Sequence, residues 1–164
     1  MFYVLGGLRF DQTKAIQAAL SLRDSVFSPE GYDDWKYDIA GLWLNHPSSF
    51  IGVVAHSLAC GTVVAAAHKL KAVQRSIDYM VLIESVWTEK LVPPNVRKLI
   101  WIQRSQWFGF PTGKVIWDGK DVPGLIVPGT DHNTVCQAAL TLDTILKGIP
   151  WRRQVSCPAP DVQT

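Results

Sequence analysis

The sequence is poor in cysteine, in charge and in basic runs, and each shortage argues against a class of protein. Only three of its 164 residues are cysteines, and Cys60, Cys136 and Cys157 stand far apart. So few and so widely spaced thiols favour a reducing compartment, the cytoplasm, over a disulfide framework. The chain has no Cys-x-x-Cys pair, which is the usual spacing of a zinc site, and we expect no metal ion.

Charged residues make up 18% of the chain, the net charge is +2, and the basic residues are scattered. Proteins that follow a phosphate backbone gather lysine and arginine into patches, so we expect no nucleic-acid partner. Hydrophobic residues make up 48%, which is typical of a globular protein. The length suits one domain, and we predict a single domain over residues 1–150 with a loosely held tail over residues 151–164.

Long apolar runs are also scarce. The chain opens on a short apolar segment and reaches Gly6-Gly7 at once, which is too short for the apolar region of a secretory signal. The stretch 50–67 is apolar enough to suggest a membrane span, but polar and small residues lie near its middle. A buried strand that leads into a buried helix explains it better, so we expect no membrane span.

Strand and helix patterns alternate along most of the chain. Strands are predicted over 2–5, 25–28, 50–55, 77–83, 96–102, 113–117 and 125–127, helices over 11–22, 32–44, 58–70 and 134–146, and irregular stretches near 87–95 and 103–113. This alternation predicts an α/β fold with a mostly parallel sheet of about six strands and helices on both faces. The carboxyl ends of parallel strands share one edge, where such folds place their sites.

The most informative segment is Val53-Val54-Ala55-His56-Ser57-Leu58-Ala59, where a serine stands between a predicted buried strand and a predicted buried helix. A nucleophile elbow needs small residues two positions either side of the serine, because its turn brings the strand and the helix close together. Ala55 and Ala59 meet this need in place of the usual glycines. We predict that Ser57 is a nucleophile and that His56 fills the variable position. The alternative for Ser57 is an ordinary helix N-cap.

A histidine that suits the general base lies in Pro128-Gly129-Thr130-Asp131-His132-Asn133, between the last predicted strand and the last predicted helix. In the chain order nucleophile, acid, histidine, the base belongs in this loop, so we predict that His132 takes the Ser57 proton. The alternative is a surface histidine at a helix start. For the oxyanion we expect the N–H of Leu58 and a second N–H from the glycine loop, that of Gly7 or else of Leu8.

Val54-Ala55-His56-Ser57-Leu58 and the distal Gly129-x-x-His132 resemble the small lipases and esterases of the α/β-hydrolase superfamily. The segment with Asp34-Trp35 before the elbow and Cys60 after it is similar to single-domain serine hydrolases of the retinoblastoma-binding-protein type. The resemblance covers nearly the full chain in the order of its elements. In residue identity it covers the elbow, the Gly-Gly loop and the histidine loop. It implies a minimal α/β-hydrolase.

The superfamily usually places its acid after the strand predicted here over 96–102, but residues 103–109 contain no carboxylate. Some members use the end of the preceding strand, where this chain has Glu84. The resemblance therefore implies that Glu84 orients His132. Asp118 and Asp131 are alternatives, and a Ser–His dyad without an acid is another.

Together these residues predict a serine hydrolase that cleaves an ester or amide of a small molecule through an acyl-enzyme, without metal or organic cofactor. A catalytically inactive binding protein of the same fold is the alternative, because the usual acid is missing and the elbow has alanines. A flavodoxin-like nucleotide binder is a third reading, for which Gly6-Gly7 is the phosphate-loop signal.

Several tryptophans suit an acyl-binding cleft, the core or a dimer surface: Trp87, Trp101, Trp107 and Trp117. The fold does not name the substrate.

Overall fold

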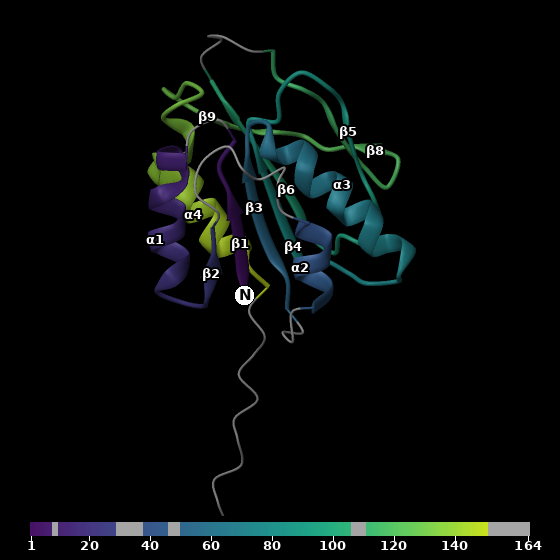
Figure 1. Cartoon of the computed structure of the whole chain (residues 1–164). Coiled ribbons are helices and arrows are strands. Elements are labelled where there is room, and N and C mark those ends of the chain that lie inside the picture. Colours follow the sequence, from purple (N-terminus) through teal and green to yellow (C-terminus); the bar gives the residue numbers. More distant parts are fainter. Residues whose placement is uncertain (8–9, 29–37, 46–49, 106–110, 151–164) are drawn as a thin grey trace, which may run out of the picture.

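Six strands form one parallel sheet in the order β2-β1-β3-β4-β6-β9 (Figure 1). The structure is a computed structural model that describes residues 1–7, 10–28, 38–45, 50–105 and 111–150. The strands are β1 (Phe2–Leu5), β2 (Val26–Phe27), β3 (Gly52–His56), β4 (Tyr79–Ile83), β6 (Leu99–Arg104) and β9 (Leu125–Val127). The prediction of an α/β fold with a mostly parallel sheet of about six strands is confirmed.

Helices cover both faces of this sheet, also as predicted (Figure 1). The helices are η1 (Phe10–Thr13), α1 (Lys14–Ser21), α2 (Ile39–Asn45), α3 (Ala59–Ala72), η3 (Val135–Gln137) and α4 (Ala139–Gly148). The chain runs from β1 to β2 in one direction along the sheet, and from β2 to β3 and β4 in the other. Right-handed crossovers then require α1 to lie on the opposite face from α2 and α3, and α4 lies on the same face as α1.

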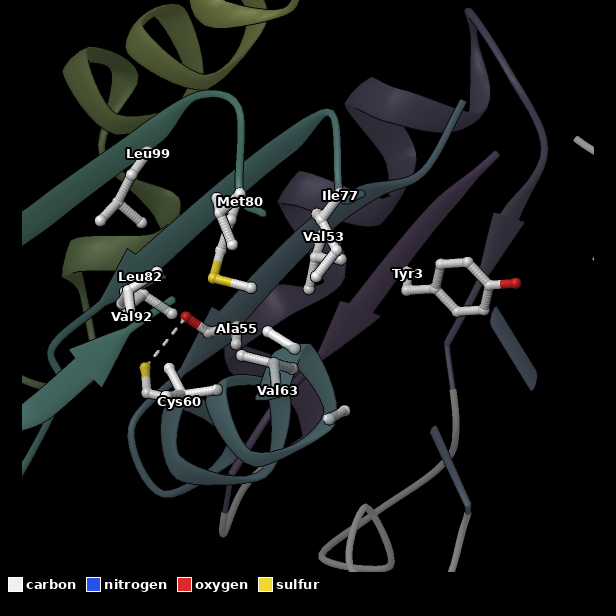
Figure 2. Close-up of a cluster of buried hydrophobic side chains, with 14 of the residues drawn as sticks. Tyr3, Val53, Ala55, Cys60, Val63, Ile77, Met80, Leu82, Val92 and Leu99 are labelled. Carbon is white, nitrogen blue, oxygen red and sulfur yellow. Dashed lines mark hydrogen bonds between the residues drawn. The ribbon is translucent and has the colours of Figure 1, made fainter. Parts of the chain in front are cut away.

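The strands bury both of their faces, which explains their near-continuous apolar sequences. In β3, Val53 and Ala55 point into one core cluster and Val54 points into the cluster on the other face. Figure 2 shows the first cluster, where the thiol of Cys60 in α3 donates to the carbonyl oxygen of Ala55 at 3.4 Å. Burial raises the pKa of this thiol to about 12, so Cys60 acts as a small packing residue.

A second, smaller sheet has the order β5-β7-β8, with β5 (Lys90–Val92), β7 (Val115–Trp117) and β8 (Lys120–Asp121). The prediction that 87–95 is irregular is therefore wrong for residues 90–92. The side chain of Lys90 is buried, and its Nζ donates to the carbonyl oxygens of Val86 and Thr88 and to the Thr88 hydroxyl. These hydrogen bonds offset the cost of burying the ammonium group. Such a short strand that opens on a lysine has no alternating pattern for a sequence argument to detect.

Other boundaries differ at the ends of elements. The helix predicted over 11–22 begins as the 3₁₀ turn η1, and the helix predicted over 134–146 is divided into η3 and α4. Residues 32–37 and the predicted tail 151–164 lie outside the described residues. The apolar stretch 50–67 is β3 followed by the first half of α3. Within the described ranges, no helix combines the length and the apolar character that a bilayer crossing needs.

Candidate active site

The strand order reverses at β1, because β2 lies on one side of it and β3 on the other. In open α/β sheets, ligands bind outside the carboxyl ends of the strands at such a switch point. The Gly6-Gly7 loop follows β1, and Ser57 follows β3 directly. The topology thus points to the same edge as the residue pattern does.

Ser57 adopts a left-handed backbone conformation, with φ of 59°, and is 3% exposed. This conformation costs a residue other than glycine about 1 kcal/mol, and a strained turn between strand and helix is the defining feature of a nucleophile elbow. The Ser57 N–H donates to the carbonyl oxygen of Ile83 in β4 at 2.9 Å, which fixes the turn to the neighbouring strand. The N-cap of α3 is Leu58 and not Ser57, and no side chain of the described residues caps it.

Gly7 lies directly against this elbow. Its φ is 48°, and a Cβ atom added to it would lie 2.9 Å from both the carbonyl oxygen of His56 and the Cβ of Ser57. The same atom would lie 3.4 Å from the backbone nitrogen of Leu58. The position therefore needs glycine for its conformation and for space, and it brings the Gly7 backbone beside the predicted oxyanion donor Leu58. Leu8, the other predicted donor, lies outside the described residues.

His132 is presented by the loop after β9, whose shape is fixed by Asp131. The Asp131 carboxylate accepts hydrogen bonds from the N–H of Asn133 at 2.8 Å and from the N–H and hydroxyl of Thr134 at 2.9 Å. The hydrogen bond from the Thr134 hydroxyl is the main cause that lowers the pKa of Asp131. The Asn133 side chain in turn accepts from Gln12 Nε2 at 2.6 Å, which connects this loop to η1.

The carboxylate beside His132 is that of Glu84. Its Oε2 lies 3.6 Å from Nδ1 of His132, within ion-pair range but longer than a hydrogen bond. Glu84 follows β4 directly, is fully buried and has a φ of 50°. Asp118, by contrast, is exposed at the turn between β7 and β8, and Asp131 caps its own loop. Of the three carboxylates predicted as alternatives, Glu84 is thus the one whose oxygen lies 3.6 Å from a ring nitrogen of His132.

A residue that the sequence argument missed, Arg104, contacts the same carboxylate. The backbone N–H of Arg104 donates to Glu84 Oε1 at 2.6 Å, and its Nη1 donates to Oε2 at 2.6 Å. Both side chains are buried, with 2% and 0% exposure. The sequence offers only a weak signal, because Glu84 and Arg104 follow two consecutive predicted strands but nothing local shows that these strands are neighbours in space.

His56 is fully buried and its ring lies over that of His132, with centroids 4.7 Å apart and planes tilted by 34°. Burial, and secondly the charge of His132, lower the pKa of His56 to about 3, against a smaller opposite effect of the His132 backbone. The ring of His56 is therefore neutral at neutral pH. It packs beside Ser57 against the ring of His132, and its place at the variable position of an elbow stays a prediction.

Of the four tryptophans proposed for a cleft, the structure describes three. Trp101 belongs to the core and is 8% exposed, and Trp117 packs against the same cluster. Trp87 is half exposed, and Trp107 lies outside the described residues. An open hollow lies at the opposite edge, near the amino ends of the strands, and is lined by Phe50, Asp78, Arg97, Lys98 and Pro150.

No protein-family model matches the chain, and no curated protein matches it. The carboxyl edge of the sheet brings together the groups that follow its strands. These are a strained serine turn, a glycine loop against it, and a histidine between a buried neutral ring and a buried carboxylate.

Gly7→Ala tests the contact between the glycine loop and the elbow. We expect it to lower the free energy of unfolding by about 2–4 kcal/mol, because strain and overpacking add. Gly119→Ala is the matched control, since Gly119 has a φ of 75° but no atom within 4 Å of an added Cβ. It should cost about 1 kcal/mol. Urea unfolding measures both, and equal costs would contradict the close contact.

The depressed pKa of His56 predicts a loss of stability in acid. The folded chain keeps His56 neutral down to about pH 3, whereas the unfolded chain binds a proton near the ordinary value of 6.5. The stabilisation is thus complete above 6.5 and is lost as the pH falls toward 3, by up to about 1.4 kcal/mol per pH unit. Urea unfolding between about pH 7 and pH 4 should show a shallower slope for His56→Phe than for wild type. A His56→Phe slope equal to that of wild type would refute the assignment.

Proposed function

We propose that the chain is a serine hydrolase of the α/β-hydrolase superfamily, which cleaves an ester or amide of a small molecule through an acyl-enzyme. One observation carries the proposal. The left-handed Ser57 turn, the Gly7 loop against it and the Glu84–His132 contact all lie at the carboxyl edge of one parallel sheet. Strained residues of this kind cluster at functional sites, where the surrounding structure maintains them.

In the first half of the reaction, Ser57 Oγ attacks the carbonyl carbon of the substrate, and its proton passes to Nε2 of His132. The carbonyl oxygen becomes an oxyanion, for which the N–H groups of Leu58 and Gly7 are the proposed donors. The first turn of α3 starts beside Ser57, and its partial positive charge favours the same oxyanion. The tetrahedral intermediate then collapses, and His132 gives its proton to the departing alcohol or amine.

In the second half, a water molecule attacks the acyl-Ser57 ester and passes a proton to His132. Collapse of this second intermediate releases the carboxylic acid and returns the proton to Ser57 Oγ. Glu84 stabilises His132 each time its ring is charged. The distance of 3.6 Å between Glu84 Oε2 and His132 Nδ1 suits this role, since such contacts shorten when substrate binds.

The proposed setting is the cytoplasm, and the proposed partner is a small-molecule ester or amide. Cys60 and Cys136 are buried free thiols, and burial raises the pKa of both. In a reducing compartment thiols stay free and disulfides are rare.

The second candidate is a binding protein of the same fold without catalytic activity. It is favoured by the contacts of Glu84, whose carboxylate makes both of its short hydrogen bonds to Arg104. The nucleotide-binding alternative has less support. In phosphate loops the glycines lead directly into a helix N-terminus, whereas α1 begins only at Lys14.

The proposal predicts covalent labelling at Ser57. Wild type should react with a fluorophosphonate probe, and Ser57→Ala should not react, because the probe phosphonylates an activated serine. Ser57→Ala should also lower kcat/KM on p-nitrophenyl acetate at least about a thousandfold. Intact-mass spectrometry and release of p-nitrophenol measure these two effects.

Ser25→Ala is the matched control, because Ser25 precedes β2 at the opposite end of the strands, and it should be labelled like wild type. Equal labelling of wild type and Ser57→Ala would refute the nucleophile. A folded wild type that neither reacts nor turns over the ester would favour the binding protein.

A further inference from the structure

The proposed reaction makes no use of Arg104, although this buried arginine contacts the proposed acid directly. Arg104 is the last residue of β6, and its side chain is 2% exposed. It approaches the Glu84 carboxylate from two points, with its backbone N–H on Oε1 and its Nη1 on Oε2, each at 2.6 Å. Such charge-assisted hydrogen bonds are short and fix geometry as well as adding stability.

The two contacts of Oε2 are unequal. This oxygen lies 2.6 Å from Arg104 Nη1 but 3.6 Å from His132 Nδ1, so the arginine contact is a hydrogen bond and the histidine contact is longer than one. The Arg104 backbone N–H donates to the other oxygen, Oε1, and this hydrogen bond does not depend on the arginine side chain. Arg104 thus contacts both oxygens of the Glu84 carboxylate, and His132 lies near one of them.

We propose that Arg104 is a positioning residue that draws the Glu84 carboxylate toward β6 and so weakens its hold on His132, keeping His132 unprotonated and able to act as a base at lower pH. The inference rests on the proposed function for its meaning in catalysis. Its physical content, a link from Arg104 through Glu84 to the protonation of His132, is separate from turnover.

The charged and titratable groups around His132 come from four places. Glu84 faces it from the end of β4, His56 from the end of β3, and Asp131 precedes it on its own loop. Arg104 contributes from the end of β6 through its contacts with Glu84. His56 is buried and neutral and Asp131 is bound by its own loop, so Glu84 is the group through which a neighbouring change can act most strongly.

The experiment is a double-mutant cycle read by NMR titration of the His132 imidazole, whose signal is assigned by its loss in His132→Asn. The four proteins are wild type, Arg104→Met, Glu84→Gln and the double variant. Without the guanidinium, the carboxylate can turn to His132, and an opposite charge that close raises the titration midpoint by about one pH unit. In the Glu84→Gln background the same change should move the midpoint by less than about half as much, since no carboxylate can turn.

Arg104→Lys is the conservative control, because it keeps the charge and a donor, and its midpoint should stay near that of wild type. If Arg104→Met does not fold, Arg104→Gln replaces it in both backgrounds with the same expected direction, since glutamine is neutral and fills part of the space. An unchanged midpoint in the variant that folds would overturn the proposal. Equal shifts with and without the Glu84→Gln change would overturn it too, because Arg104 would then act by its own charge alone.

The same samples separate this inference from the proposed function. If the chain is a hydrolase, the acidic limb of its kcat/KM profile on p-nitrophenyl acetate should move with the NMR midpoint. If wild type is not labelled by a fluorophosphonate but the His132 midpoint responds as described, the proposed hydrolase fails and the positioning role of Arg104 stands. If labelling succeeds and the midpoint is insensitive to Arg104, the hydrolase stands and the positioning role fails.

Discussion

The candidate site depends on the parallel register of β3, β4 and β6. The pairing of His56 with Ile83 makes Ser57 and Glu84 the next residues on adjacent strands, and both therefore emerge at the same edge. Helices bury both faces of the sheet, so polar side chains that follow these strands lie at its carboxyl edge. A slip of one residue between β3 and β4 would move Ser57 and Glu84 apart and turn the strand residues toward the wrong faces.

The same local geometry occurs twice at this edge. Ser57 and Glu84 both follow a strand in the left-handed conformation, and each donates its N–H to the next strand, to Ile83 and to Ile102, at 2.9 Å. These hydrogen bonds extend the sheet by one residue and help to offset a backbone cost of about 1 kcal/mol at each turn. The strain keeps the two side chains at the rim of the sheet. It is consistent with a site whose groups are held in position before substrate arrives.

The features that could be predicted from the sequence are those with local signals. The strand over 125–127 and the turn at Ser57 follow from apolar runs, small flanking residues and the position of the serine between them. The strand over 90–92 has no such signal, since its pairing with β7 arises from tertiary contacts. The pair of Glu84 and Arg104 also escaped prediction, because it depends on which strands are neighbours in space, and a charged residue at a strand end more often faces solvent.

The most direct test of the account is the distance between Ser57 Oγ and His132 Nε2. It can be measured in crystals at a resolution of about 1.2 Å, where the partners of the histidine can be identified and its hydrogens begin to appear. The account predicts about 2.6–3.2 Å between these atoms, with Glu84 on the Nδ1 side of the same ring. A His132 ring turned away from Ser57, with a bulky side chain between the two, would contradict it and favour a binding protein.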